Sequence, residues 1–180
     1  MRLETDRLVL RPWQDTDRPQ LAAILGDAEV RRFYPKVLTP EETNQLIDHA
    51  IACASEDGFS FFAAELKQTG RLAGWLGLGR IPTDTRAALR GMPEVEIGWQ
   101  FDKSLWGQGL APEGARAWLD YGFGILGLAE IVAFTYAGNA PSRRVMEKLG
   151  MVRNPQDDFE YPRLPSGHHL RPHVLYRIAR

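Results

Sequence analysis

The segment at residues 94–101 alternates between apolar and polar side chains without a break. One face of the extended chain carries the side chains of Val95, Ile97, Trp99 and Phe101. The other face carries Glu94, Glu96, Gly98 and Gln100. Helical spacing follows at residues 111–126, and strand character returns at residues 131–136. A strand, a crossover helix and a second strand place the two strands parallel to each other. The sequence therefore predicts one parallel pair within a sheet.

Antiparallel partners for this pair are predicted on both sides along the chain. Residues 59–66 and 71–78 are rich in aromatic and aliphatic side chains and are separated by a polar turn at residues 67–70, which is typical of a hairpin. Short strands are expected at residues 8–10 and 173–178. Residues 79–93 are expected to form a connecting loop.

Two further helices are predicted in the first third of the chain. The first begins at a capping Asp15 or Asp17 and ends at Gly26, with Leu21, Ile24 and Leu25 facing inward. The second begins at a capping box, because Thr39 is followed by Pro40 at the first helical position and by Glu42 three residues after the cap. Its predicted apolar stripe comprises Leu46, Ile47, Ala50 and Ile51.

Another helix is predicted at residues 140–149, ending at Gly150. Helices on both faces of a mixed sheet give an α/β (α+β) fold in three layers, α/β/α, with mostly antiparallel strands. A chain of 180 residues with 44% hydrophobic residues has enough apolar material for one core, so residues 1–180 are expected to form a single domain.

Charge and composition exclude several classes of function. Lysine and arginine number 22 and aspartate and glutamate 23, so no broad positive field for nucleic acid is expected. The longest stretch without a charged residue, residues 131–142, is well short of the ~20 residues that cross a bilayer. The single cysteine, Cys53, and the charged N-terminus predict a cytoplasmic protein.

One glycine pattern resembles a dinucleotide-binding fingerprint but stands in the wrong context. Gly122, Gly124 and Gly127 have the fingerprint spacing. That motif binds pyrophosphate only where it joins a strand to the beginning of a helix. Here the glycines lie at the end of a helix and precede a strand, so nucleotide binding is not expected there.

The segment at residues 106–113 is the better candidate for an anion site, because it lies between the alternating strand and the crossover helix. Gly107 and Gly109 allow a tight turn that directs several N–H groups toward one point, and Pro112 suits a first helical turn. Phosphate groups would meet the positive end of the helix. An ordinary glycine-rich turn explains the same residues.

A second cluster, residues 138–151, follows the strand at 131–136. Helical spacing from Ser142 places Val145, Met146 and Leu149 inward, with Asn139 one turn before Ser142. A capping role for Asn139 and a position in the first turn for Ser142 are sufficient to explain both.

Taken together, these motifs resemble the GNAT acyl-CoA N-acyltransferases, and within them the RimJ/RimL type, the ribosomal-protein N-terminal acetyltransferases. The resemblance rests on Glu-Thr-Asp-Arg-Leu-Val-Leu-Arg-Pro from Glu4, on Trp-Gly-Gln-Gly-Leu-Ala from Trp106, and on Asn-Ala-Pro-Ser-Arg-Arg-Val-Met-Glu-Lys-Leu-Gly-Met from Asn139. It covers the chain from Glu4 to the C-terminus. It implies the GNAT fold, with the parallel strand pair splayed around acetyl-CoA.

The resemblance also implies a set of cofactor contacts. Backbone amides of Gly107, Gln108, Gly109, Leu110 and Ala111, beside Trp106, would hold the pyrophosphate of acetyl-CoA. The strand ending in Trp99, Gln100 and Phe101 would pair with the pantetheine amides, and Asn139 and Ser142 would contact the pantetheine arm near the sulfur. Ser104 stands where the family often has glutamine or arginine.

The reaction implied by the resemblance is direct attack of a neutral amine on the thioester, which needs a proton acceptor and a proton donor. Glu96 matches the strand position of the base in many members, acting through water, and Glu94 is the alternative on the same face. Many members carry a tyrosine acid where this chain has Met146. Ser142 is the expected substitute, and bulk water is its competitor.

The expected acceptor is the N-terminal α-amine of a protein or peptide, because an α-amine with a pKa of ~8 is partly neutral at physiological pH. A small-molecule amine such as a polyamine, an amino acid or an antibiotic is the alternative substrate. A CoA-binding module without catalysis is the alternative class.

The family often forms homodimers. No metal is expected, since the histidines of the tail, His168, His169 and His173, have no acidic or cysteine ligand after Glu160.

Overall fold

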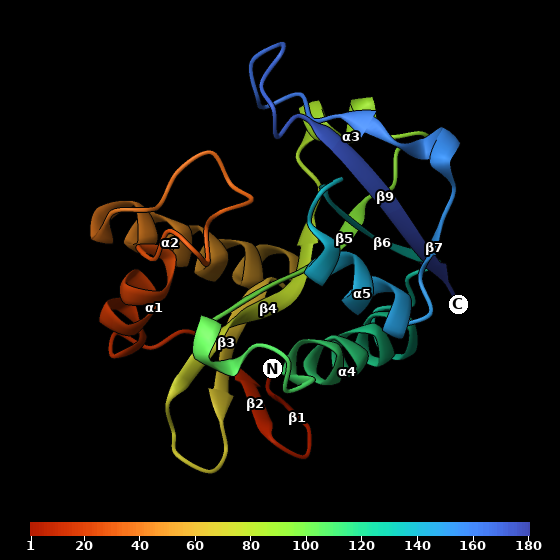
Figure 1. Ribbon diagram of the computed structural model, residues 1–180. Helices are drawn as coiled ribbons and strands as arrows, with labels where there is room; N and C mark the ends of the chain where they lie inside the picture. The colour runs from red at the N-terminus through yellow and green to blue at the C-terminus, as the bar shows by residue number, and fades with distance from the viewer. The chain divides into compact units, whose positions relative to one another are not determined.

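A computed structural model describes residues 1–180 and consists of five α-helices, two short 3₁₀ helices and a nine-stranded sheet (Figure 1). In chain order the elements are β1 (Leu3–Glu4), β2 (Leu8–Arg11), α1 (Asp17–Leu25), α2 (Pro40–Asp57), β3 (Phe61–Leu66), β4 (Leu72–Arg80), α3 (Thr83–Ala88), β5 (Val95–Phe101), η1 (Lys103–Leu105), α4 (Leu110–Gly124), β6 (Glu130–Tyr136), α5 (Ala140–Lys148), β7 (Val152–Arg153), η2 (Pro155–Asp157), β8 (Phe159–Glu160) and β9 (Pro172–Ala179).

The sheet is mixed, as predicted. Its strand order is β1-β2-β3-β4-β5-β6-β9-β7, and β8 pairs with β9. The crossover through α4 makes β5 and β6 parallel, with Glu96 opposite Val132. Antiparallel pairing joins β1 to β2, β2 to β3, β3 to β4, and β9 to β6, β7 and β8. The predicted α/β class, the hairpin and the parallel pair are therefore confirmed.

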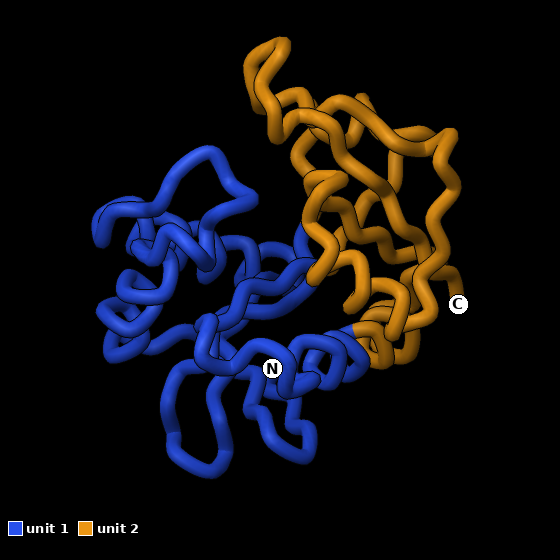
Figure 2. The backbone as a smooth tube through the Cα atoms, viewed as in Figure 1, with its two compact units in different colours: residues 1–79, 98–118 blue, residues 80–97, 119–180 orange.

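The chain divides into two compact units (Figure 2), and each is described by itself. Unit 1 comprises residues 1–79 and 98–118. On one side of its strands, α1 and α2 bury a cluster that includes Leu21, Ile47 and Ala63, with Trp75 packed against it. On the other side α4 packs closely, because a Cβ added at Gly114 would lie 2.3 Å from a methyl carbon of Leu76.

Unit 2 comprises residues 80–97 and 119–180. Strands β6 and β9 pair along their whole length, from Glu130 opposite Ala179 to Tyr136 opposite His173 (Figure 1). Buried Val132 and Leu175 form a cluster with Ile81 and Leu89, the residues that flank α3. Helix α5 lies against the opposite face, where the Tyr176 hydroxyl donates to the Glu147 carboxylate.

The two predicted helices of the first third form, but their caps differ. At α2 the capping box is present as predicted: the Thr39 hydroxyl accepts from the Glu42 N–H, and the Glu42 carboxylate accepts from the Thr39 N–H. The prediction that Asp15 or Asp17 caps α1 is wrong. Thr16 is the cap and makes no side-chain hydrogen bond. The Asp17 carboxylate is instead held by the buried Arg11 guanidinium, at 2.7 and 2.8 Å.

Two other expectations are corrected. Residues 79–93 are not a plain loop, because β4 continues to Arg80 and α3 follows it; a helix of six residues is too short to show a periodic pattern. Ile51, placed in the apolar stripe of α2, is 44% exposed, since Ile47 and Ala50 already fill the contact with α1. The short strands β1, β7 and β8 were not foreseen.

No helix combines the length and the apolar character that crossing a membrane requires.

Candidate active site

The glycine-rich turn lies where the sequence predicts, between β5 and α4. Gly107 and Gly109 adopt the left-handed conformation, with φ angles of 76° and 79°. None of the five amides from Gly107 to Ala111 donates a hydrogen bond to another protein group, whereas the Glu113 N–H begins the helical pattern by donating to the Gly109 carbonyl at 3.2 Å. Five unsatisfied N–H groups at the beginning of a 15-residue helix suit an anion such as pyrophosphate.

A network from the N-terminal segment braces this turn. The Arg7 guanidinium donates to the Glu113 carboxylate at 2.6 Å and to the Gln108 carbonyl at 2.8 Å. The same carboxylate accepts from the Thr5 hydroxyl at 2.5 Å and from the Arg7 N–H at 2.9 Å. A Cβ at Gly109 would lie 3.6 Å from the Arg7 guanidinium, so this cation lies beside the turn. Sequence reasoning missed Arg7, because its partners are about a hundred residues away.

Trp106 opens the turn and is 38% exposed. Its indole N–H donates to the Phe101 carbonyl at 3.0 Å, which ties the turn to the end of β5. The Arg32 guanidinium lies over the indole, 4.6 Å from the ring centroid, and also over Phe33. Trp106 thus supports the shape of the turn.

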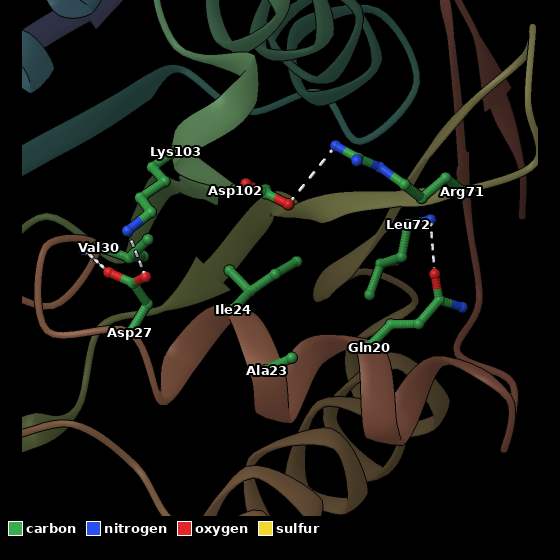
Figure 3. A pocket seen from close by; sticks show the side chains of 9 residues that line it. All are labelled: Gln20, Ala23, Ile24, Asp27, Val30, Arg71, Leu72, Asp102 and Lys103. Atoms are coloured by element: carbon green, nitrogen blue, oxygen red, sulfur yellow. Dashed lines mark hydrogen bonds and ion pairs between the residues drawn. The ribbon is translucent and has the colours of Figure 1, made fainter.

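Ser104, which departs from the family pattern, holds a cation of another segment. Its hydroxyl accepts from the Arg71 guanidinium at 3.0 Å. Arg71 also lies 3.5 Å from the Asp102 carboxylate, at the rim of a cavity of about 280 Å³ between α1 and the β4–β5 side of unit 1 (Figure 3). Lys103 at the same cavity pairs with Asp27 at 2.7 Å. Because its charges are paired with one another, this cavity presents no unpaired ionic group.

The three residues assigned to the end of β5 point to different sides. The Gln100 side chain is buried and donates to the Val30 carbonyl at 3.3 Å. Phe101 is buried and Trp99 is partly exposed on the other face of the strand. A contact with pantetheine amides would use the main chain of these residues, not their side chains.

Asn139 and Ser142 come together at the beginning of α5 in unit 2. The Asn139 side-chain carbonyl accepts from the Ser142 N–H at 3.3 Å, so the capping role is confirmed. Its amide group donates to the Ser142 hydroxyl at 3.1 Å and to the Thr135 hydroxyl at 2.9 Å. Since the Ser142 oxygen is an acceptor in this contact, its own proton is available for another acceptor.

Glu96 lies on β5 opposite Val132 and is partly buried. No side chain or main-chain group of the described residues 1–180 forms a hydrogen bond or an ion pair with its carboxylate. Burial without a partner raises the pKa of Glu96 to about 8, and the charge of Arg163 opposes this rise. Arg163 itself is held at 2.9 Å by the Asp84 carboxylate of α3. A carboxyl group with this pKa exchanges protons near neutral pH.

Glu94, the alternative base, has a different environment. Its carboxylate is exposed and lies 3.2 Å from the Arg86 guanidinium and 3.7 Å from that of Arg80. The Glu94 carboxylate is thus occupied by guanidinium groups, whereas that of Glu96 has no partner. The geometry therefore favours Glu96.

A group of aromatic side chains lies in the same unit as Glu96 and was not foreseen as a group. Tyr161 and His173 stack with centroids 4.7 Å apart, and Phe134 and Phe159 meet edge to face at 5.7 Å. Burial raises the pKa of Tyr161, an effect to which the charge of Glu96 adds, and burial lowers the pKa of His173. His173 thus packs as a member of this aromatic group. His168 and His169 stack on each other.

Comparison with known proteins gives one consistent result. The model of the acetyltransferase (GNAT) domain family matches residues 7–152. The uncharacterized protein YkkB of Bacillus subtilis (strain 168) is 34% identical over 151 residues, which cover 83% of this chain and 84% of that protein. FsC-acetyl coenzyme A-N(2)-transacetylase of Aspergillus fumigatus is 32% identical over 153 residues, which cover 83% of this chain and 64% of that protein.

A solved structure of RimL, a ribosomal L7/L12 α-N-protein acetyltransferase in complex with coenzyme A, has the same fold, with a TM-score of 0.78 over 99% of this chain and 98% of that one. At 16% identity this likeness concerns the fold alone. The family match, which spans most of the chain, adds the chemistry. The glycine-rich turn, the parallel strand pair and the family match lead to one conclusion: this chain belongs to the GNAT acetyltransferases, enzymes that transfer an acetyl group from acetyl-CoA.

Proposed function

We propose that residues 1–180 act as one domain that transfers an acetyl group from acetyl-CoA to an α-amine, with the N-terminal amine of a protein or peptide as the acceptor. The observation that carries this proposal is the Glu96 carboxyl group, which has no hydrogen-bond partner and a pKa of about 8. A free α-amine has a pKa of ~8. Proton transfer between groups of equal pKa is close to balanced, so Glu96 is matched to this class of amine.

Acetyl-CoA is a substrate here and supplies an activated thioester. The residues present suit its pyrophosphate: the amides of Gly107, Gln108, Gly109, Leu110 and Ala111 are free, and the Arg7 guanidinium is beside them. The assignment of the Trp99–Phe101 main chain to the pantetheine amides follows from the family resemblance and is part of the proposal.

In the proposed reaction, Glu96 accepts a proton from the acceptor ammonium, directly or through one water, and leaves a neutral amine. The amine nitrogen then forms a bond with the thioester carbonyl carbon, and the carbon–sulfur bond breaks as the thiolate departs. The nitrogen releases its second proton to water. Proton transfer by a positioned carboxylate contributes about 10²- to 10⁴-fold to such a rate.

In this proposal Ser142 relays a proton to the thiolate: its hydroxyl donates to the sulfur and takes up a proton from water in the same step. Asn139 fixes the Ser142 oxygen by donating to it at 3.1 Å, which leaves the hydroxyl proton free to move. Met146, at the position where many family members carry a tyrosine, cannot serve. A Ser142→Ala variant that keeps its full kcat would assign this step to water instead.

The relatives' names bear on the acceptor. The RimL name specifies an α-N-protein acetyltransferase, and the Aspergillus fumigatus relative is named FsC-acetyl coenzyme A-N(2)-transacetylase. A small-molecule amine is the second candidate acceptor. In both cases the proposal requires an amine of moderate pKa.

The deciding experiment incubates the protein with acetyl-CoA and a panel of amines, and follows thiol release together with product mass. The panel contains a peptide with a free α-amine, the same peptide with a blocked α-amine and a free lysine, a free amino acid, and a polyamine. We expect turnover on the free α-amine peptide and little on the blocked one. Turnover on the polyamine alone would overturn the acceptor assignment, and acetyl-CoA binding without any turnover would make the chain a CoA-binding module.

A further inference from the structure

Arg31 is a buried cation that the acetyl-transfer proposal does not use. It follows α1 in the chain and turns inward to β5, with 9% of its surface exposed. Its Nε–H donates to the Lys36 carbonyl at 3.1 Å, and one Nη1–H donates to the Gln100 side-chain oxygen at 3.4 Å. The Tyr34 ring covers the guanidinium at 3.8 Å.

The guanidinium has more donors than the protein satisfies. Arginine carries five N–H groups, and the two contacts above use two of them. No carboxylate of the described chain lies within 4.0 Å of Arg31. The Glu42 carboxylate acts on it only from farther away, because it is bound to Lys36 and to the Thr39 N–H. A buried cation without an anionic partner is unfavourable, so Arg31 lowers the stability of the folded protein.

The other buried arginine of unit 1 shows the contrast. Arg11 is 8% exposed, much like Arg31, yet its guanidinium is saturated by the Asp17 and Glu65 carboxylates at 2.7 and 2.8 Å. The pKa of Arg11 is raised by these partners, whereas the pKa of Arg31 is lowered by desolvation. Of these two buried guanidinium groups in one unit, Arg11 has acidic partners, and Arg31 has only neutral ones.

The side of the sheet on which Arg31 lies indicates which substrate would supply that partner. Gln100, its neighbour, is on the face of β5 that also carries Gly98, and a Cβ at Gly98 would meet Phe61 and Trp75, on the side of α1 and α2. Helix α4 packs on the other side, through Gly114 against Leu76. The amides that suit pyrophosphate begin α4 and lie beside Arg7, so the phosphates of acetyl-CoA have their own cation and are not assigned to Arg31.

We propose that Arg31 binds a carboxylate of the amine acceptor, with Gln100 orienting the guanidinium, so that the enzyme prefers acceptors bearing an acidic group. This inference rests on the proposed acetyl transfer. The planar guanidinium has parallel N–H groups that match two carboxylate oxygens, and three such groups are free. The carboxylate could be the α-carboxylate of an amino acid or an acidic side chain of a peptide.

The test compares acceptor pairs that differ only in charge. One pair is alanine and alaninamide, and the other is two tetrapeptide amides with alanine first and either glutamate or glutamine second. We expect the wild-type KM to be about tenfold lower for the acidic member of one pair, within the range of a charge-assisted hydrogen bond. The pair that shows the preference identifies the source of the carboxylate.

Arg31→Gln should abolish this preference by raising the KM of the acidic member about tenfold, while kcat and the KM of the neutral member stay within about twofold. Arg31→Lys should keep part of the preference. Arg18→Gln is the matched control, because Arg18 is an α1 arginine of the same unit whose guanidinium is paired with Asp48. Thermal unfolding of each variant accompanies the kinetics.

Three results would overturn the inference: no preference in either wild-type pair, a preference that survives Arg31→Gln, or an equal loss on acidic and neutral acceptors together with a lower Tm. Failure of the proposed function has a different signature, since none of the four acceptors would then be acetylated. In that case calorimetric binding of the two tetrapeptides to wild type and Arg31→Gln, with coenzyme A present, still decides the role of Arg31.

Discussion

The glycine-rich turn and the surroundings of Glu96 differ in how the protein treats its polar groups. The turn offers five free main-chain N–H groups and is braced by charged side chains, with Arg7 and Glu113 in direct contact. Glu96 is a single side chain with no hydrogen-bond partner, in the unit that holds the aromatic pair Tyr161 and His173. The turn depends on the geometry of its main chain. Glu96 depends on the absence of hydrogen-bond partners for its carboxylate.

This difference explains how each site responds to substitution. A backbone site tolerates side-chain changes that keep its φ angles, whereas a desolvated carboxylate depends on one group and its surroundings. Binding of acetyl-CoA and proton transfer should therefore be separable by single substitutions. Three substitutions test that separation.

The largest effect is expected at Glu96. Glu96→Gln keeps the shape and removes the proton acceptor, so kcat should fall about 100-fold or more while acetyl-CoA affinity stays unchanged. In the wild type, kcat/KM should rise as the pH increases toward about 8, because only the deprotonated carboxylate accepts a proton. In Glu96→Gln, kcat/KM should no longer show the rise with pH that titration of Glu96 causes. A profile identical to the wild type would remove Glu96 from the reaction.

Stability provides the control for Glu96→Gln. A carboxyl group whose pKa is raised on folding binds more protons in the folded state, so the free energy of unfolding decreases as the pH rises from about 4.5 toward 8. The slope for one proton is about 1.4 kcal/mol per pH unit. Glu96→Gln should flatten this slope, as measured by urea unfolding between pH 5 and 9, and should not be less stable than the wild type at the alkaline end.

The next effect is expected at Gly109. A valine there is strained because φ is 79°, and it distorts the turn that directs the free amides. Acetyl-CoA affinity, measured by calorimetry, should fall about tenfold. Gly70→Val is the matched control, since Gly70 also has a positive φ, 67°, and open space around its Cβ position. Equal affinities for the two variants would contradict the anion role of the turn.

The smallest effect is expected at Arg7. Arg7→Met removes the cation beside the turn and the brace to Glu113, and the KM for acetyl-CoA should rise about threefold. The effect is modest because the Arg7 side chain is 49% exposed and its charge is screened by solvent. Arg2→Met is the control, as Arg2 is exposed and pairs only with Glu4. An unchanged KM would limit Arg7 to a structural role.

The sequence was informative where the signal was local. The alternation at β5, the capping box at Thr39 and the two glycines of the turn each depend on neighbouring residues, and all three were predicted correctly. The helix α3 was missed because its six residues have no amphipathic repeat. The misplaced Ile51 shows that periodicity predicts a stripe but does not predict how wide the contact with the neighbouring helix is.

The unforeseen parts of the candidate site are long-range. Arg7 and Glu113 are 106 residues apart, and Arg31 and Gln100 are 69 residues apart. An unpaired buried guanidinium cannot be recognised from sequence, because Arg11 and Arg31 are indistinguishable until their neighbours are known. The same reasoning separates Glu94 from Glu96: Glu94 is exposed and lies near two arginines, whereas Glu96 is partly buried and has no such partner.

The main-chain character of the glycine-rich turn has a consequence for how such an enzyme can diversify. Because the five free amides belong to the backbone, the proposed pyrophosphate site does not need the side chain of Gln108 as a donor. Mutations that change the choice of acceptor at other residues can then accumulate while the donor substrate stays the same. One ancestral scaffold could in this way give rise to enzymes for many amines, each using the same cellular pool of acetyl-CoA.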